Sequence, residues 1–295
     1  MKISQKRIVT AYVFLAIPLA FYIVVRFYPM IYTFWLSFTN WRLISPKKDF
    51  VGFDNFVKLF KDKVFMTSLW NTIKYVVCGV PLVIVLSLFL AATLNKVRHL
   101  QWFYRLLYVM PYITPLVAVS WVWRWIYQRP PAGVLNNILM AFGLDAQPFL
   151  TSMNQSLPAI VVTTVWVNLG YCIIIYLAGL QTIPQEYLEA AKIDGATSRQ
   201  SFFKITLPLL NPITVFLVVT QSITFLRIFT QVYNMTDQGS GGPLNATKPL
   251  VLYIYQKAFR SFDMGLASSA SVILFMLIMG ITLIQLLVLN KRVQY

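Results

Sequence analysis

Long apolar runs separated by shorter polar stretches dominate the pattern of this chain. A helix needs roughly 20 apolar residues to cross the hydrocarbon core of a membrane. The first run, residues 8–25, follows basic residues as a signal peptide does, but it has no small-residue cleavage site and continues through 28–38. We therefore predict an all-α polytopic membrane protein with six transmembrane helices, at 8–38, 72–94, 104–127, 157–180, 212–233 and 266–289.

Prolines interrupt two of the predicted spans. Pro81 lies in the second span, and Pro111 and Pro115 lie in the third. Proline removes a backbone donor from a helix, and neighbouring helices in a membrane tolerate the resulting distortion. We expect kinks or local unwinding at these three positions.

A polar segment of mixed charge, residues 40–66, separates the first span from the second. Within it, F-V-G-F-D-N-F-V-K-L-F-K-D at residues 50–62 predicts an amphipathic helix. This helix either anchors the protein at the membrane interface or contacts a partner outside the membrane. We divide the chain into residues 1–66, the first span and its following loop, and residues 67–295, a core of five spans.

A second polar stretch, residues 184–208, joins the fourth and fifth spans and reads P-Q-E-Y-L-E-A-A-K-I-D-G-A-T-S-R-Q-S-F-F-K-I-T-L-P. Thr182 with Gln185, and Thr197 with Gln200, have the spacing of capping boxes at helix starts. Gly195 lies where the chain must turn between two such helices, since glycine adopts positive φ without strain. We therefore predict a hairpin of two short helices in water beside the membrane.

Composition excludes a soluble domain, because 58% of the 295 residues are hydrophobic and only 12% are charged. The net charge of +16 is compatible with nucleic-acid binding, but basic residues in a membrane protein usually set its topology. Lysine and arginine are almost equally numerous on the two sides of the predicted bundle, but they are concentrated in the short connections on the side of the termini. Both termini and the 184–208 stretch are therefore predicted to be cytoplasmic.

The acidic residues all lie in loops or at the ends of spans: Asp49, Asp54, Asp62, Asp145, Glu186, Glu189, Asp194, Asp237 and Asp263. An ion-driven carrier generally needs an ionisable group inside the membrane, so an ion relay is not expected. The chain has no G-x-x-x-x-G-K-[ST] loop for ATP, and its one histidine, His99, lacks companions for a triad or a metal site. We expect neither an enzyme nor a metal protein, and energy for transport must come from a partner.

The polar hairpin carries a recognisable motif. Glu189-Ala190-Ala191 and Asp194-Gly195-Ala196, followed by Phe202, Ile205, Leu207 and Pro208, resemble the EAA signature of permease subunits in binding-protein-dependent type I ABC importers, in the sugar and glycerol-phosphate branch. The resemblance implies that residues 181–208 form a coupling loop that docks on an ATPase. A self-sufficient secondary carrier or channel with six spans is the alternative.

The resemblance also implies partners and a location. They are a homologous second permease, two ABC ATPase subunits that hold ATP and Mg²⁺, an extracytoplasmic solute-binding protein, and the lipid of a bacterial or archaeal inner membrane. This chain itself would bind no cofactor and no nucleic acid.

Roles within the coupling loop follow from residue chemistry. Glu189 and Asp194 offer charge to a basic group of the ATPase or hold the local turn. Ala190 and Ala191 allow another surface to approach closely, and Gly195 with Ala196 makes the bend.

Polar residues inside two spans are candidates for the solute path. Thr164 and Asn168 are four residues apart on one span, and Gln221 and Thr224 are three apart on the next. Their amides and hydroxyls suit the hydroxyls of a sugar or polyol, while hydrogen bonds that only pack the bundle explain them equally well. Arg227 either reaches the outer interface or pairs with an anionic solute.

The outer loop before the last span contains G-S-G-G-P at residues 239–243, where glycine and proline exclude a regular element. It is either a flexible turn or a contact for a binding protein.

Overall fold

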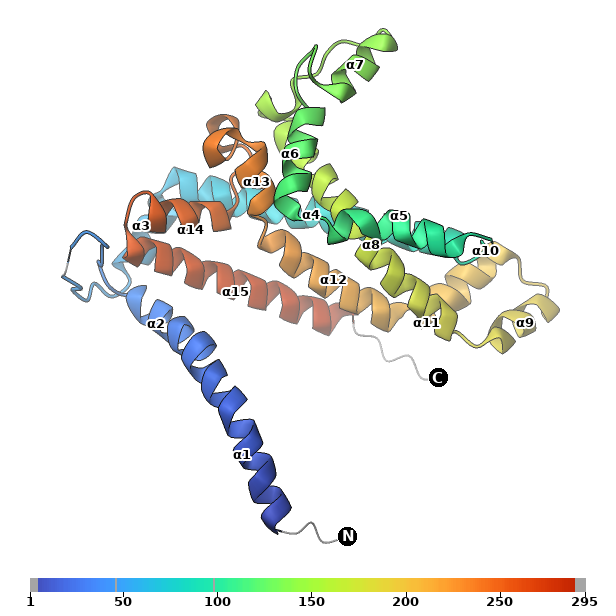
Figure 1. Cartoon of the computed structure of the whole chain (residues 1–295), viewed down its shortest axis with the longest axis horizontal. Helices are drawn as coiled ribbons and strands as arrows, with labels where there is room; N and C mark the ends of the chain where they lie inside the picture. The colour runs from blue at the N-terminus through green and yellow to red at the C-terminus, as the bar shows by residue number, and fades with distance from the viewer. Residues whose placement is uncertain (1–4, 46, 98, 290–295) are drawn as a thin grey trace. The chain divides into compact units, whose positions relative to one another are not determined.

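The computed structural model describes residues 5–45, 47–97 and 99–289 (Figure 1). Within these ranges the regular elements are helices, apart from two isolated β-bridges, so the predicted all-α class is confirmed. Contacts group the chain into two compact units, residues 1–62 with 254–275, and residues 63–253 with 276–295. The division at residue 66 stays a prediction.

The first unit begins with a long apolar helix. Helix α1 (Gln5–Tyr22) passes through a π-helical turn (Ile23–Phe27) into α2 (Tyr28–Leu36), and Figure 1 traces them as one continuous rod. An 18-residue window in this rod has none of its residues buried within the chain. Because its apolar surface faces outward on all sides, the rod suits a lipid environment, which agrees with the first predicted span.

The polar segment that follows this rod, in the same unit, contains one short helix. Helix α3 (Asp54–Lys61) buries Asn55, whose amide donates hydrogen bonds to the carbonyls of Ser37 at 3.0 Å and Thr39 at 2.7 Å. Val57 and Phe60 lie on its exposed side. The helix is amphipathic as predicted but shorter than residues 50–62, because Gly52 adopts positive φ before it and Asp62 is extended after it.

Helix α8 (Ser156–Thr182) is the centre of the second unit. It packs against α4 (Lys63–Leu94) and α5 (Gln101–Ile113), and α4 packs against α12 (Asn211–Leu226). Two glycines allow this close approach, since a β-carbon on Gly79 would overlap the ring of Phe225 and one on Gly170 would overlap the carbonyl of Tyr108.

The third predicted span, 104–127, is not straight. Helices α5 and α6 (Leu116–Ile126) meet at a bend of 95°. Thr114 is extended with ψ of 138°, as expected for a residue before proline, and Pro115 has no N–H to continue the ladder. The break occurs at Pro115, while α5 continues past Pro111.

The fifth predicted span, 212–233, also needs correction. Helix α12 ends at Leu226, because Arg227 and Phe229 leave helical geometry, and residues 230–235 form the separate helix α13 (Thr230–Met235). At its other end α12 meets the helical segment Ser198–Leu209 at a bend of 65°.

The remaining spans are confirmed with changed bounds. Helix α4 begins well before residue 72 and runs without a break past Pro81, so the expected unwinding there is wrong. Membrane helices tolerate proline where neighbouring helices compensate for the lost hydrogen bond. With α8, α15 (Met264–Leu289) and the first rod, the described residues hold four long apolar helices, or six spans when each bent pair counts as one. The other short elements are α7 (Val134–Ala141), α14 (Leu250–Phe259), and 3₁₀ turns at Phe149–Thr151, Asp237–Gly239 and Pro243–Asn245.

Candidate functional site: the hairpin between two spans

The polar stretch after α8 forms the predicted hairpin. Its first arm is α9 (Gln185–Ile193), and its second arm is α10 (Ser198–Ser201), which continues through a π-helical turn (Phe202–Thr206) into α11 (Leu207–Leu209). The capping box at the second arm is confirmed. The Thr197 hydroxyl accepts from the backbone N–H of Gln200 at 3.3 Å, and the Gln200 side chain accepts from the backbone N–H of Thr197 at 2.8 Å.

The predicted capping box at Thr182 and Gln185 is wrong. Thr182 is the last residue of α8, where its hydroxyl donates to the carbonyl of Gly179 at 2.8 Å, and Pro184 is the N-cap of α9. Gln185 instead donates to the Glu189 carboxylate at 2.7 Å, one turn further along the same helix.

Gly195 makes the turn between the arms with φ of +77°. The N–H of Ala196 donates to the carbonyl of Ala191 at 2.9 Å, and the N–H of Gly195 donates to that of Lys192 at 3.1 Å. This pair of bonds is the Schellman arrangement that closes a helix with a left-handed residue. A β-carbon on Gly195 would meet nothing within 4 Å, so the backbone angle, and not lack of space, demands glycine.

The two arms enclose a hollow of about 630 Å³, which we call the hairpin hollow. Five of the six predicted coupling residues line it, and Glu189 instead lines an adjoining hollow of about 520 Å³. The residues of the hairpin hollow are Tyr187, Ala190, Ala191, Asp194, Gly195, Ala196, Gln200, Ser201, Lys204 and Ile205. The structure thus brings Ala190, Ala191, Asp194, Gly195 and Ala196 together on one concave surface and leaves Glu189 outside it.

Ile193 was missed by the sequence reasoning. Its side chain is 87% exposed at the end of α9, beside Lys192 and Asp194, which are also exposed. This exposed side chain gives the polar hairpin an apolar group that a docking partner can contact. The available signal was an isoleucine at the last helical position, between two charged residues, Lys192 and Asp194.

The predicted path residues do not form one cluster of hydrogen bonds. Thr164 and Asn168 are buried, and each bonds within α8: the Thr164 hydroxyl to the carbonyl of Ile160, and the Asn168 amide to that of Thr164, both at 2.8 Å. Thr224 is exposed on α12 and its hydroxyl donates to the carbonyl of Thr220. Within the described chain, no hydrogen bond joins the pair on α8 to the pair on α12.

Gln221 differs from the other path residues. It is 2% exposed, and its side-chain oxygen has no hydrogen-bond partner among the described residues. On the neighbouring residue, the Ser222 hydroxyl accepts from the Gln285 amide of α15 at 2.7 Å, and the Gln285 oxygen is likewise without a partner. Buried amide oxygens are normally satisfied, so each of these two oxygens has acceptor capacity left for a ligand, a water or another chain. Gln285 was overlooked, although a glutamine within the last apolar run was visible.

The structure combines several helices long and apolar enough to span a membrane with a capped polar hairpin between two of them. The chain belongs to the family of binding-protein-dependent transport system inner membrane components, whose pattern matches residues 83–295. It is a permease subunit of an ABC importer, and the self-sufficient carrier or channel is set aside.

Relatives cover nearly the whole chain. The probable ABC transporter permease protein YesP of Bacillus subtilis (strain 168) is 40% identical over 87% of this chain and 82% of its own length. The lactose transport system permease protein LacF of Rhizobium radiobacter is 35% identical over 96% of this chain and 95% of its own. A bacterial alginate ABC transporter, crystallised with an alginate pentasaccharide-bound periplasmic protein, contains a chain of the same fold with a TM-score of 0.84 and 24% identity, covering 95% and 93% of the two chains.

Proposed function

We propose that this chain pairs with a homologous second permease to form the path of a sugar or related polyol, and that two partner ATPases holding ATP and Mg²⁺ drive the transport. The observation that supports it most directly is the hairpin hollow, where five of the six predicted coupling residues line one concave surface next to a left-handed glycine.

Within the hairpin, each side chain has a proposed role in docking the ATPase. Ile193 would enter an apolar recess of that partner, and Ala190 and Ala191 let its backbone approach. Asp194 faces a basic group of the ATPase, and Glu189, oriented by Gln185, faces another.

We propose an orientation in the inner membrane with the hairpin and both termini in the cytoplasm, and with the solute-binding protein on the opposite side. The density of basic residues in the short connections supports it. Residues 1–4 and 290–295, the ends of the chain, lie outside the described residues.

The solute is proposed to be a sugar or polyol met by Thr164, Asn168, Gln221 and Thr224. The name of LacF, a lactose permease, and the free acceptor of buried Gln221 support this assignment. Arg227 is exposed and directly follows the last residue of α12, so we assign it to the outer interface and not to solute binding.

Reconstitution tests the proposed function directly. Liposomes containing this chain alone should neither hydrolyse ATP nor accumulate sugar, because no phosphate-binding loop exists in the sequence. Liposomes with the sister permease, both ATPases and the solute-binding protein should do both. Robust sugar flux from this chain alone would contradict the proposal.

The path assignment has a separate test. Replacing both Asn168 and Gln221 by leucine should lower sugar uptake about tenfold or more, since each lost hydrogen bond to solute is worth about 1 kcal/mol. Basal ATP hydrolysis, measured in the same vesicles, reports on assembly. Thr163→Val is the matched control, because Thr163 is also buried on α8 and its hydroxyl bonds to the carbonyl of Ala159. Normal uptake by the double variant would remove these residues from the path.

A further inference from the structure

An apolar groove lies beside the end of α4, next to the second arm of the hairpin. Its volume is about 590 Å³, and eight of its twelve lining residues have hydrocarbon side chains. Val85 and Phe89 in its wall are 64% and 65% exposed, so the groove is open to whatever lies beside the chain. The hydroxyls of Tyr176 and Thr214 bond to each other at 3.2 Å, and that of Thr93 donates to a carbonyl of its own helix. The groove therefore offers mainly hydrocarbon contacts.

A polar hollow continues this groove. It is the hollow of about 520 Å³ described above, and Ala92, Lys96 and Phe202 line both cavities. Its walls are the ends of α4 and α8 and both arms of the hairpin, so it lies between the hairpin and the spans, and we call it the membrane-side hollow. The apolar helices end here, which marks the boundary of the hydrocarbon core. The groove is thus at the depth of acyl chains, and the hollow is at the depth of lipid head groups.

Uncompensated positive charge lies at the junction of the two cavities. Lys96 and Lys192 line the membrane-side hollow, and both are exposed. None of the ion pairs among the described residues includes either lysine. Glu189 is the one acidic residue in this wall, and its carboxylate accepts from Gln185 at 2.7 Å. The hollow therefore favours an anion, and basic pockets beside membrane helices are known to hold phospholipid head groups.

We propose that the apolar groove and the membrane-side hollow together bind one anionic glycerophospholipid, with an acyl chain in the groove and its phosphate beside Lys96. A soluble anion would leave the groove empty, and an apolar helix of another subunit would leave Lys96 without a counter-charge. A phospholipid supplies both groups on one molecule. The lipid would fill the space between the hairpin and the spans. This inference rests on the proposed orientation, which makes it a lipid of the cytoplasmic leaflet.

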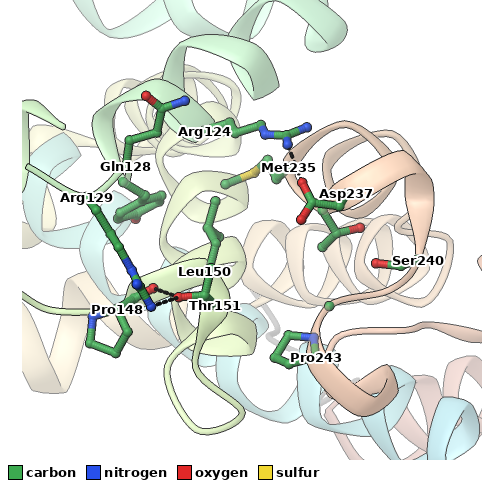
Figure 2. Close-up of a pocket in the computed structure, with 13 residues that line it drawn as sticks. Arg124, Gln128, Arg129, Pro148, Leu150, Thr151, Met235, Asp237, Ser240 and Pro243 are labelled. Carbon is green, nitrogen blue, oxygen red and sulfur yellow. Dashed lines mark hydrogen bonds and ion pairs between the residues drawn. The ribbon is translucent and has the colours of Figure 1, made fainter. Parts of the chain in front are cut away.

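A second polar pocket, at the opposite end of α8, lacks this combination. Its volume is about 350 Å³, and it shares no lining residue with the apolar groove. Figure 2 shows that Arg124 meets the carboxylate of Asp237 there, while Arg129 donates to the hydroxyl of Thr151 at 3.3 Å. Arg129 is exposed like Lys96, so it provides a control cation in a polar pocket that the groove does not reach.

The test measures lipid binding to the purified complex in detergent, without ATP or solute. The delipidated complex is titrated with phosphatidylglycerol or phosphatidylcholine, and bound lipid is counted by native mass spectrometry. Phosphatidylglycerol should bind once per copy of this chain and more tightly than phosphatidylcholine. Lys96→Gln should weaken its binding about fivefold, equal to about 1 kcal/mol, whereas Lys96→Arg should retain it. Ala92→Phe should also weaken binding, because the added ring fills the wall that the two cavities share.

Arg129→Gln is the matched control and should leave phosphatidylglycerol binding unchanged. Unchanged binding in both Lys96→Gln and Ala92→Phe would overturn the proposal. So would the absence of bound phosphatidylglycerol on the unaltered complex, since another subunit would then cover the groove. Displacement of the lipid by millimolar inorganic phosphate would reduce the site to an anion site and also overturn it. Lipid binding by a complex that does not accumulate sugar would contradict the proposed function alone.

Discussion

Replacing Gly195 by valine is expected to abolish ATP-driven uptake in a complex that still assembles. The backbone of Gly195 has φ of +77°, and an L residue pays about 1–2 kcal/mol for left-handed geometry, more when it is β-branched. The hairpin would relieve this strain by opening the Schellman bonds, which displaces Asp194 from the hairpin hollow and also shifts the neighbouring Ile193. Uptake and binding-protein-stimulated ATP hydrolysis, measured together in vesicles, should both fall.

Gly143→Val is a closely matched control. Gly143 also has positive φ, +76°, and a β-carbon there would also meet nothing within 4 Å, but it follows α7 far from the hairpin along the chain. Both variants introduce the same kind of backbone strain. A lower uptake in Gly195→Val than in Gly143→Val would therefore report the coupling role of the hairpin turn. Equal uptake by the two variants would remove the hairpin turn from the coupling mechanism.

Replacing Gly170 by valine is expected to destabilise the helical core. A β-carbon on Gly170 would overlap the carbonyl of Tyr108, and backbone cannot rotate away as a side chain does. Overpacking a tight contact costs about 1–3 kcal/mol, and α5 would have to separate from α8. The apparent melting temperature of the purified complex in detergent should fall by about 5 °C or more.

Gly280→Val provides the comparison. Gly280 lies within α15, and a β-carbon there would meet no atom within 4 Å. The two variants share the change in side chain and in helix propensity, so a difference in melting temperature isolates the α5 to α8 contact. A similar melting temperature for both would mean that this close approach does not stabilise the fold.

The apolar runs predicted most of the membrane-spanning helices, because a span requires only about 20 consecutive, mainly apolar residues. The errors lie where one run contains two helices. The run 104–127 is apolar over most of its length, and hydropathy does not register that the chain bends by 95° at Pro115. Pro81 has the same chemistry but lies in an unbroken helix, so neighbours decide which proline bends a span.

The hairpin could be predicted from the sequence because interactions between residues close along the chain determine its structure. The capping box at Thr197 and the positive φ of Gly195 depend on residues within a few positions. The ion pair between Arg124 and Asp237 could not be predicted from sequence, since the two residues are 113 positions apart and only tertiary structure brings them together. Ile193 could be recognised as a surface residue only from the structure, where it is 87% exposed. In the sequence, nothing distinguishes an exposed isoleucine from one that packs in the core.

The hydrogen bonds that hold the loop around the turn Pro243–Asn245 impose an order on biosynthesis. Asn71 and Tyr75 are made early, but their acceptors at Asn245 and Thr247 follow 174 and 172 residues later. At about 5–20 residues per second, a ribosome needs roughly 10 seconds or more to add that length. Until then both buried side chains of α4 lack these partners, so the loop is completed only after residue 247 has been added. A chain truncated before residue 245 would insert its early spans and still lack the carbonyls that accept from Asn71 and Tyr75.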